Sequence, residues 1–295
     1  MKFLLVTDLD NTLVGDRRAT LTLNQRLVAR RDHFYLVYAT GRSLSSFQQL
    51  QQEFAAATGT QLLEPDYLVT GVGTEIYHQG QLDQDWAARL DQNWQRQAIA
   101  LFLESFPVLI PQPEAEQNPW KISYYLQPPE ISPNNSLSNS GDNPDLVSSI
   151  LVRTGKFLRA EGRRSPQKLP NQSGDYYNSQ VIDHLRSQLT AAGLAAQVIF
   201  SSNEDVDILP CQGDKGQAVA YLMQKLKILP QFTLVCGDSG NDISMFQQQT
   251  LGVIVGNAQP ELLDWHNAHP HNHRYLARST HADAIWEAIS HFQLL

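Results

Sequence analysis

The sequence predicts an α/β fold: a doubly wound, Rossmann-like parallel sheet with an α+β layer inserted into it. Four short apolar runs without alternation each end in small polar residues, which is typical of parallel strands buried on both faces. Amphipathic helical stretches such as 44–54 and 217–226 lie between these runs. From about residue 80 to 209 the pattern changes to helices set against antiparallel-like strands. We therefore expect a core of residues 1–79 and 210–295 and an inserted unit of residues 80–209.

The four apolar runs define the strands of the core. They are Phe3–Val6, Phe34–Val37, Phe232–Val235 and Val253–Val255. In open α/β sheets, ligands bind outside the carboxyl ends of the strands. The polar residues that follow each run are therefore the first candidates for a functional site.

The inserted unit begins with a Trp-rich helical stretch at 83–106 and a strand-like run at 120–126. A second helical stretch, 181–192, leads into two further strands. We place these two strands at 197–201 and 206–209. The sequence thus predicts helices packed on a small, mainly antiparallel sheet.

Within this unit, residues 132–179 contain two polar clusters rich in Ser, Asn, Pro and Gly. One helix-like stretch, 146–161, lies between the clusters. Such compositions cannot bury enough apolar surface to offset the cost of ordering the chain, so we expect loops or partial disorder in both clusters. Nothing in the segment carries chemistry by itself.

The composition is that of a soluble globular protein. A formal net charge of −8 argues against nucleic acid or an anionic membrane as the main partner. The run Phe3–Val6 is too short for the core of a signal peptide, and no stretch approaches the length of a membrane span. Cys211 and Cys236 adjoin apolar runs, which predicts buried, reduced thiols. We expect a cytoplasmic monomer whose partner is a small molecule.

Two carboxylates follow the first strand, in Asp8-Leu9-Asp10-Asn11-Thr12. Carboxylates two residues apart, where the chain turns out of a strand, can converge on one small volume. Phosphoryl transfer through a covalent intermediate needs a carboxylate nucleophile and a second group that protonates the leaving oxygen. An ordinary Asp/Asn turn is the alternative interpretation of this motif alone.

Two weaker signals are Thr40-Gly41-Arg42, at the end of the second strand, and Lys215, at the start of an amphipathic helix. A hydroxyl and exposed backbone N–H groups near a helix start can bind phosphate oxygens. An ammonium group can offset the charge of a phosphoryl group and its nucleophile. Thr-Gly turns and solvated lysines are both common, so neither signal is specific alone.

The most specific motif is Gly237-Asp238-Ser239-Gly240-Asn241-Asp242, directly after the third strand. Small residues and two acids on one turn suit a hard cation, because carboxylates and water complete the octahedron that Mg²⁺ prefers. The cluster His266, His269, His271 and His273 lacks a carboxylate or Cys at ligand spacing after Trp265, so we expect a solvated loop there rather than a metal site.

Together, and in this order, the four motifs resemble the signature motifs of the haloacid dehalogenase (HAD) superfamily, and the inserted unit resembles its type 2 cap. Further stretches are similar to the sucrose-phosphate phosphatase family of cyanobacteria and plants. The resemblance covers nearly the whole chain except residues 132–179, which look like an insertion. The stretches that carry it are Asp8–Thr12, Tyr38–Arg42, Pro65–Tyr67, Gly73–Tyr77, Glu116–Tyr124, Phe200–Pro210 and Val235–Asp242.

The resemblance implies a Mg²⁺-dependent phosphatase that converts sucrose 6-phosphate to sucrose and phosphate, the last step of sucrose synthesis. It implies that Asp8 is the nucleophile that forms an aspartyl-phosphate, and that Asp10 is the acid and base. Mg²⁺ would be held by Asp8, the carbonyl of Asp10 and Asp238, with Asp242 in support. The resemblance assigns the phosphoryl oxygens to Thr40, Gly41, Lys215 and Asn241.

The cap is expected to recognise the sugar, because an uncharged disaccharide needs short polar side chains. The candidates are Glu116, Asn118 and Lys121, with Asp205 and Asp207 as weaker ones. For Trp120 we expect burial in the core of the cap.

Two alternatives remain open. One is another capped sugar-phosphate phosphatase, acting for example on mannosyl-3-phosphoglycerate or glucosylglycerol phosphate. The other is a non-catalytic sugar-phosphate-binding partner of sucrose-phosphate synthase. That second interpretation predicts a loss of catalytic residues, yet Asp8, Asp10, Lys215 and Asp238 are all present.

Overall fold

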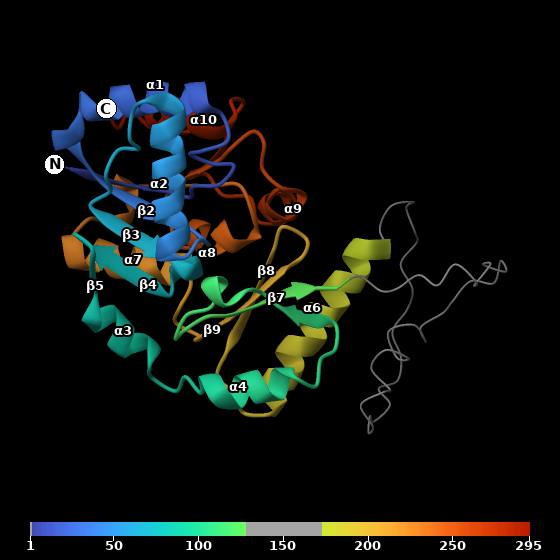
Figure 1. The fold of residues 1–295 in the computed structure, drawn as a ribbon. Helices are drawn as coiled ribbons and strands as arrows, with labels where there is room; N and C mark the ends of the chain where they lie inside the picture. The colour runs from blue at the N-terminus through green and yellow to red at the C-terminus, as the bar shows by residue number, and fades with distance from the viewer. Residues whose placement is uncertain (1, 128–172) are drawn as a thin grey trace.

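The computed structural model describes residues 2–127 and 173–295, which form two units, each built around its own β-sheet. The larger is a sheet of eight strands with helices on both faces, and the smaller is a sheet of four strands beside it (Figure 1). This arrangement confirms the predicted α/β fold with an inserted α+β unit. The strands of the large sheet, in spatial order, are β12 (Arg274–Leu276), β11 (Leu251–Ile254), β10 (Thr233–Gly237), β1 (Phe3–Thr7), β2 (Phe34–Ala39), β3 (Tyr67–Thr70), β4 (Glu75–His78) and β5 (Gln81–Leu82).

The central strand β1 shows why this sheet is buried on both faces. Phe3 and Leu5 pack with one hydrophobic cluster, whereas Leu4 and Val6 pack with another on the opposite face. Because side chains alternate across a strand, a run without polar residues supplies both cores at once. One cluster is completed by α1 (Arg17–Val28), α2 (Leu44–Thr58) and α10 (His281–His291), and the other by α3 (Gln84–Leu90), α7 (Lys215–Leu226), α8 (Ile243–Phe246) and α9 (Pro260–Ala268).

The strand order creates the crevice in which a site is expected. Strand β1 pairs in parallel with β10 on one side and β2 on the other. From β1 the chain continues to β2 on one side, whereas from β10 it continues to β11 on the other side. The carboxyl ends of β1 and β10 therefore meet at a topological switch point. Short 3₁₀ turns lie between the main elements: η1 (Arg31–His33), η2 (Gly71–Gly73), η3 (Glu114–Glu116), η5 (Pro230–Phe232) and η6 (Gly240–Asp242).

The small sheet is antiparallel, in the order β6 (Leu109–Pro111), β7 (Ile122–Leu126), β9 (Asp205–Leu209) and β8 (Gln197–Ser201). Helices α4 (Arg96–Leu103) and α6 (Ser173–Ala191) cover one face, where Ile122, Tyr124 and Val206 are buried. Since side chains alternate along a strand, the residues between these point to the opposite face. That second face is polar, and it is turned towards the large sheet.

The structure corrects the prediction of one helical stretch over residues 83–106. The stretch divides into α3 and α4. Strand β5 belongs to the large sheet and α3 packs against it, although both lie past the predicted boundary at residue 80. The indole N–H of Trp86 donates to the carbonyl of Gly73 at 3.1 Å, which ties α3 to the strand layer. A large aromatic side chain with a buried hydrogen bond thus decides where this helix packs.

A second correction concerns the end of the predicted insertion. Helix α6 begins at Ser173, within a segment expected to be a polar loop, and Tyr177 and Asn178 are buried in it. The predicted helix at 146–161 lies outside the described residues. Cys236 is buried as expected, whereas Cys211 is exposed. Of the helices in the described ranges, none combines the length and apolar character that crossing a membrane requires.

Candidate active site

The buried ammonium of Lys215 organises the acidic loops at the switch point. Its Nζ donates to Oδ1 of Asp8, Asn241 and Asp242, each at 2.7 Å, and the side chain has no exposed surface. Lys215 is the first residue of α7, where Asp214 caps the helix by accepting the N–H of Gln217. Burial by itself lowers the pKa of Lys215, but Asp242 and Asp8 outweigh it and raise that pKa. The side chain is therefore charged.

Three carboxylates gather around this lysine. Asp8, Asp238 and Asp242 each offer an oxygen within 4.8 Å of the others. Burial raises the pKa of Asp8 well above its usual range, although Lys215 opposes it. Burial and the neighbouring Asp242 raise the pKa of Asp238 to about 7. One ammonium thus leaves excess negative charge in a buried volume, and hard oxygen donors with excess charge fit Mg²⁺.

Within this cluster, Asp242 has both carboxylate oxygens engaged by the protein. Its Oδ2 accepts the backbone N–H groups of Asp238 at 2.9 Å and Ser239 at 3.1 Å, while Oδ1 faces Lys215. Asp238 is oriented from the other side, because the hydroxyl of Thr12 donates to its Oδ1 at 2.9 Å. Asp242 therefore fixes the loop, and the oxygens of Asp8 and Asp238 line the pocket.

Asp10 forms a two-point ion pair with Arg42. The Nε and Nη2 of Arg42 donate to the two carboxylate oxygens at 2.8 and 2.7 Å, and Nη1 donates to the hydroxyl of Ser46 at 2.9 Å. The hydrogen bond with Asp10 is the main cause that raises the pKa of Arg42. Arg42 was not among the site residues predicted from the sequence, although it directly follows the Thr-Gly turn at a strand end.

Thr40 and Gly41 differ in their access to the pocket. The hydroxyl of Thr40 is fully buried and accepts the N–H of Arg42 at 3.1 Å, so it shapes the turn rather than the pocket wall. Gly41 and Asn241 lie on the wall, and Lys215 lies directly behind Asp8 and Asn241. The residues predicted to bind phosphate thus come together, but only Gly41 and Asn241 reach the cavity surface.

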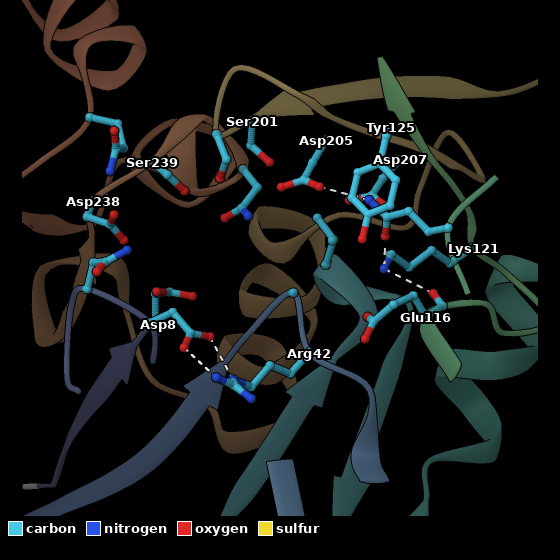
Figure 2. Close-up of a pocket in the computed structure, with 18 residues that line it drawn as sticks. Asp8, Arg42, Glu116, Lys121, Tyr125, Ser201, Asp205, Asp207, Asp238 and Ser239 are labelled. Atoms are coloured by element: carbon cyan, nitrogen blue, oxygen red, sulfur yellow. Dashed lines mark hydrogen bonds and ion pairs between the residues drawn. The ribbon is translucent and has the colours of Figure 1, made fainter. Parts of the chain in front are cut away.

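A cavity of about 300 Å³ lies between the two sheets. In Figure 2, Asp8, Arg42 and Asp238 face Glu116, Lys121 and Asp205 across it. Six acids but only two cations line it, so an anionic ligand needs further positive charge to enter. The acids are Asp8, Asp10, Glu116, Asp205, Asp207 and Asp238; the cations are Arg42 and Lys121; the remaining residues are Asn11, Gly41, Val72, Gln112, Tyr125, Ser201, Ser202, Ser239, Asn241 and Gln259.

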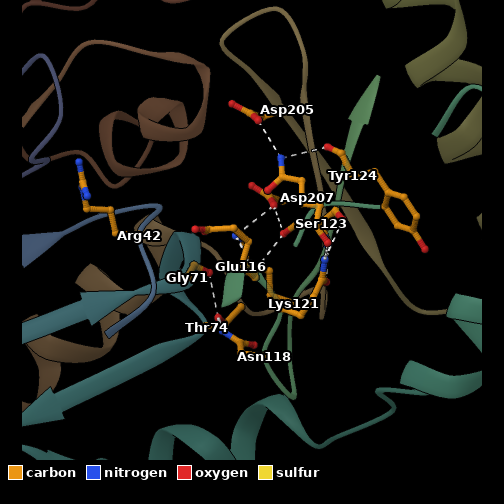
Figure 3. Close-up of polar contacts among 12 residues, drawn as sticks. Arg42, Gly71, Thr74, Glu116, Asn118, Lys121, Ser123, Tyr124, Asp205 and Asp207 are labelled. Carbon is orange, nitrogen blue, oxygen red and sulfur yellow. Dashed lines mark hydrogen bonds and ion pairs between the residues drawn. The ribbon is translucent and has the colours of Figure 1, made fainter. Parts of the chain in front are cut away.

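The wall contributed by the small sheet is a hydrogen-bonded network (Figure 3). Lys121 donates to the carbonyl of Glu116 at 3.1 Å and pairs with Asp207 at 3.4 Å, although only 3% of its surface is exposed. The hydroxyl of Ser123 donates to Asp207 at 2.6 Å. Burial and the neighbouring Asp207 raise the pKa of Asp205. Hydrogen bonds and an ion pair therefore fix the directions of the Lys121 and Asp207 side chains on this wall.

Asn118 and Trp120 both lie elsewhere than predicted. Asn118 was expected to contact a sugar, but its amide donates to the hydroxyl of Thr74 at 2.8 Å and its side chain is not part of the pocket lining (Figure 3). The reason is a tight turn in which its Oδ1 accepts the N–H of Trp120. Trp120 is buried as expected, but it packs in the core of the large sheet, and its indole donates to Asp91.

On the side of the small sheet, four residues of the pocket wall were not predicted from the sequence: Gln112, Tyr125, Ser201 and Ser202. For Tyr125, period-two alternation along the predicted strand 120–126 was a usable signal, since Lys121 and Tyr125 share a face. For the others, no local pattern distinguishes them from ordinary loop residues.

Within residues 2–127 and 173–295, the carboxylates of Asp8, Asp238 and Asp242 are the one group of three or more acidic, His or Cys ligands close enough to hold a metal.

Known proteins resemble this chain in sequence and in fold. The sequence model for "Sucrose-6F-phosphate phosphohydrolase" matches residues 1–160 and 172–293. A crystal structure of the sucrose-phosphatase from Synechocystis sp. PCC6803, in complex with sucrose and phosphate, is 43% identical, with a TM-score of 0.78 and 99% of each chain covered.

Two curated relatives mark the range of similarity. Sucrose-phosphatase 2 of Nicotiana tabacum is 33% identical and covers 99% of this chain, but the chain spans only 60% of the tobacco protein. Mannosylfructose-phosphate phosphatase of Agrobacterium fabrum is 28% identical over 99% of this chain and 97% of its own length. The match to the family model over nearly all residues decides the assignment, and the chain belongs to the sucrose-6F-phosphate phosphohydrolase family.

Proposed function

We propose that this protein is a Mg²⁺-dependent phosphatase that hydrolyses sucrose 6-phosphate to sucrose and phosphate, the last step of sucrose synthesis. The observation that carries the proposal is the buried cluster of Asp8, Asp238 and Lys215, which opens into a cavity whose opposite wall is polar. Family membership supports the same reaction. A covalent route through an aspartyl-phosphate explains why a carboxylate nucleophile is buried beside an ammonium.

In the proposed first step, Asp8 attacks phosphorus and the bond from phosphorus to the sugar oxygen breaks. Asp10 gives its proton to the departing sugar oxygen, then removes a proton from the water that cleaves the aspartyl-phosphate, which regenerates both groups. Both oxygens of Asp10 are bound to Arg42 in this structure. The carboxyl group of Asp10 must therefore exchange Arg42 for the substrate before it can act.

Mg²⁺ would be held by the carboxylates of Asp8 and Asp238 and the backbone carbonyl of Asp10, with Asp242 fixing the loop. When bound, the metal offsets the repulsion between an anionic nucleophile and an anionic substrate. Gly41 and Asn241 would bind phosphoryl oxygens at the cavity surface, with Lys215 behind them and Thr40 shaping the turn.

The sugar would lie against the network of Glu116, Lys121 and Asp205. A disaccharide carries many hydroxyls and no charge, so it needs fixed donors and acceptors rather than a charged pocket alone. Tyr125 adds an aromatic surface at the edge of this wall, 40% exposed, on which a sugar ring can stack.

A second candidate substrate is mannosylfructose phosphate. The chain covers 97% of the length of the mannosylfructose-phosphate phosphatase relative, against 60% of the tobacco sucrose-phosphatase. The catalytic cluster acts on the phosphoryl group in either case, so the wall of the small sheet would decide between the two sugars.

We also propose that the protein is a cytoplasmic monomer, that residues 80–209 act largely as a cap, and that it can associate with sucrose-phosphate synthase. These proposals rest on the composition and on the family resemblance. Size-exclusion chromatography with and without a synthase chain tests the state and the association.

The central experiment measures phosphate release from sucrose 6-phosphate, mannosylfructose phosphate, mannosyl-3-phosphoglycerate and glucosylglycerol phosphate, with Mg²⁺ and with EDTA. We expect sucrose 6-phosphate to have the highest kcat/KM, and activity to require Mg²⁺. The Asp8→Asn variant is nearly isosteric but cannot attack phosphorus, so it should fold and be inactive. Substantial turnover by folded Asp8→Asn would refute the assignment of Asp8 as the nucleophile. A higher kcat/KM for another sugar phosphate would refute the proposed preference for sucrose 6-phosphate.

A further inference from the structure

The β8–β9 hairpin of the small sheet brings polar residues to the cavity. Its tip, Ser202-Asn203, turns with two left-handed residues, whose φ angles are 55° and 60°. Ser201, Ser202 and Asp205 from this hairpin line the cavity. The position of the hairpin relative to the large sheet therefore sets the shape of one wall.

The hairpin rests directly on the loop that contains Asp238. A Cβ placed on Gly240 would lie 2.7 Å from the carbonyl oxygen of Phe200 and 3.2 Å from Cγ of Glu261. No larger residue fits at Gly240 without displacing the hairpin, since real Cβ atoms do not approach backbone oxygens so closely. The backbones of the two units are in contact at this point.

One carboxylate joins the two units across this contact. Oε1 of Glu261, in the first turn of α9, accepts the backbone N–H of Ser202 at 3.2 Å and that of Gly240 at 3.4 Å. The first donor belongs to the hairpin tip and the second to the loop between Asp238 and Asp242. On its other side the hairpin is held within its own unit, where the amide of Asn178 donates to Oδ1 of Asn203 at 2.8 Å.

We propose that Glu261 is a positioning residue for sugar specificity: it seats the β8–β9 hairpin on the loop of Asp238 and so fixes the wall formed by Ser201, Ser202 and Asp205. Its carboxylate touches neither the nucleophile nor the pocket lining beyond the N–H of Ser202. A single anionic acceptor shared by two N–H donors favours one relative placement of two backbones. The specificity role rests on the proposed phosphatase function, whereas the role of Glu261 in holding the hairpin on the loop does not.

The test compares Glu261→Ala and Glu261→Gln with the wild-type chain. Asp264→Ala is the matched control, because it removes an exposed carboxylate from the same helix. The first readout is amide hydrogen exchange at Ser202, which needs no substrate. We expect exchange about threefold faster or more in Glu261→Ala, because the N–H loses its acceptor. Glu261→Gln keeps an acceptor oxygen and, like Asp264→Ala, should stay close to wild type.

The second readout is the ratio of kcat/KM for sucrose 6-phosphate to kcat/KM for 4-nitrophenyl phosphate. This ratio should fall about tenfold in Glu261→Ala, because the aryl phosphate does not use the sugar wall. An unchanged exchange rate at Ser202 in Glu261→Ala would overturn the proposal that Glu261 holds the hairpin on the loop. Equally faster exchange in Glu261→Gln and Glu261→Ala would overturn it as well. An unchanged ratio would overturn the specificity role. If the wild-type chain does not hydrolyse sucrose 6-phosphate, the proposed function fails. The exchange rates still decide whether Glu261 holds the hairpin on the loop of Asp238.

Discussion

Replacing Lys215 by Met tests whether its ammonium offsets the charge of the acidic cluster. Met has a similar length and no charge, so little cavity forms. The change removes three hydrogen bonds of 2.7 Å, to Asp8, Asn241 and Asp242, from a side chain with no exposed surface. The carboxylates stay behind without a counter-charge, and breaking a buried ion pair from one side costs roughly 3–5 kcal/mol.

Lys225→Met is the matched control on the same helix. Lys225 also donates to a carboxylate, that of Asp83 at 2.6 Å, but 39% of its side chain is exposed. An ion pair with an exposed lysine contributes about 0–1 kcal/mol, because water solvates the ammonium. Asp83 itself is buried, but without Lys225 it still accepts hydrogen bonds from the hydroxyl of Tyr221 and the backbone N–H groups of Asp85 and Trp86. The two lysines thus have similar ion-pair distances and differ mainly in burial.

The assay is urea unfolding with EDTA present, which gives the free energy of unfolding of each variant. We expect Lys215→Met to lose about 3–5 kcal/mol and Lys225→Met no more than about 1 kcal/mol, with unchanged m-values. Adding Mg²⁺ should recover part of the loss in Lys215→Met, since the metal supplies the missing positive charge. Equal losses in the two variants would refute the argument that burial makes Lys215 the essential counter-charge.

Three further predictions concern other parts of the molecule. Asp10→Ala should lower kcat about 10²–10⁴-fold through lost acid–base catalysis, while calorimetry still detects Mg²⁺ binding; lost binding would make its side chain a metal ligand. Lys121→Ala should reduce kcat/KM for sucrose 6-phosphate more than for 4-nitrophenyl phosphate, and equal factors would contradict a role in sugar recognition. Burial raises the pKa of Glu287, but hydrogen bonds from Ser279, Tyr275 and Arg278 outweigh it and lower that pKa to about 2. A lowered folded-state pKa stabilises the fold above the unfolded value of about 4.3, and this contribution is lost as the pH falls towards 2. The difference in Tm between wild type and Glu287→Gln should therefore shrink over that range, and a constant difference would refute the sign.

The large sheet and the residues at its active edge follow from the sequence alone. An apolar run without alternation has to be buried on both faces, and parallel strands bring their carboxyl ends to one edge. Asp8 and Asp238 could therefore be placed together from the strand ends, whereas Lys215 was added to them by the family resemblance. The alternation along 120–126 likewise places Tyr125 on the same face as Lys121.

The way in which the small sheet faces this edge depends on tertiary contacts that no local pattern encodes. The pairing of Asp10 with Arg42, the turn of Asn118 onto Thr74 and the bridge made by Glu261 all join residues that are far apart in sequence. Loop side chains follow no period, and their directions depend on which donors and acceptors the other unit presents. The packing of Trp86 and Trp120 on the large sheet shows the same dependence, because an aromatic side chain predicts burial but not the core in which it is buried.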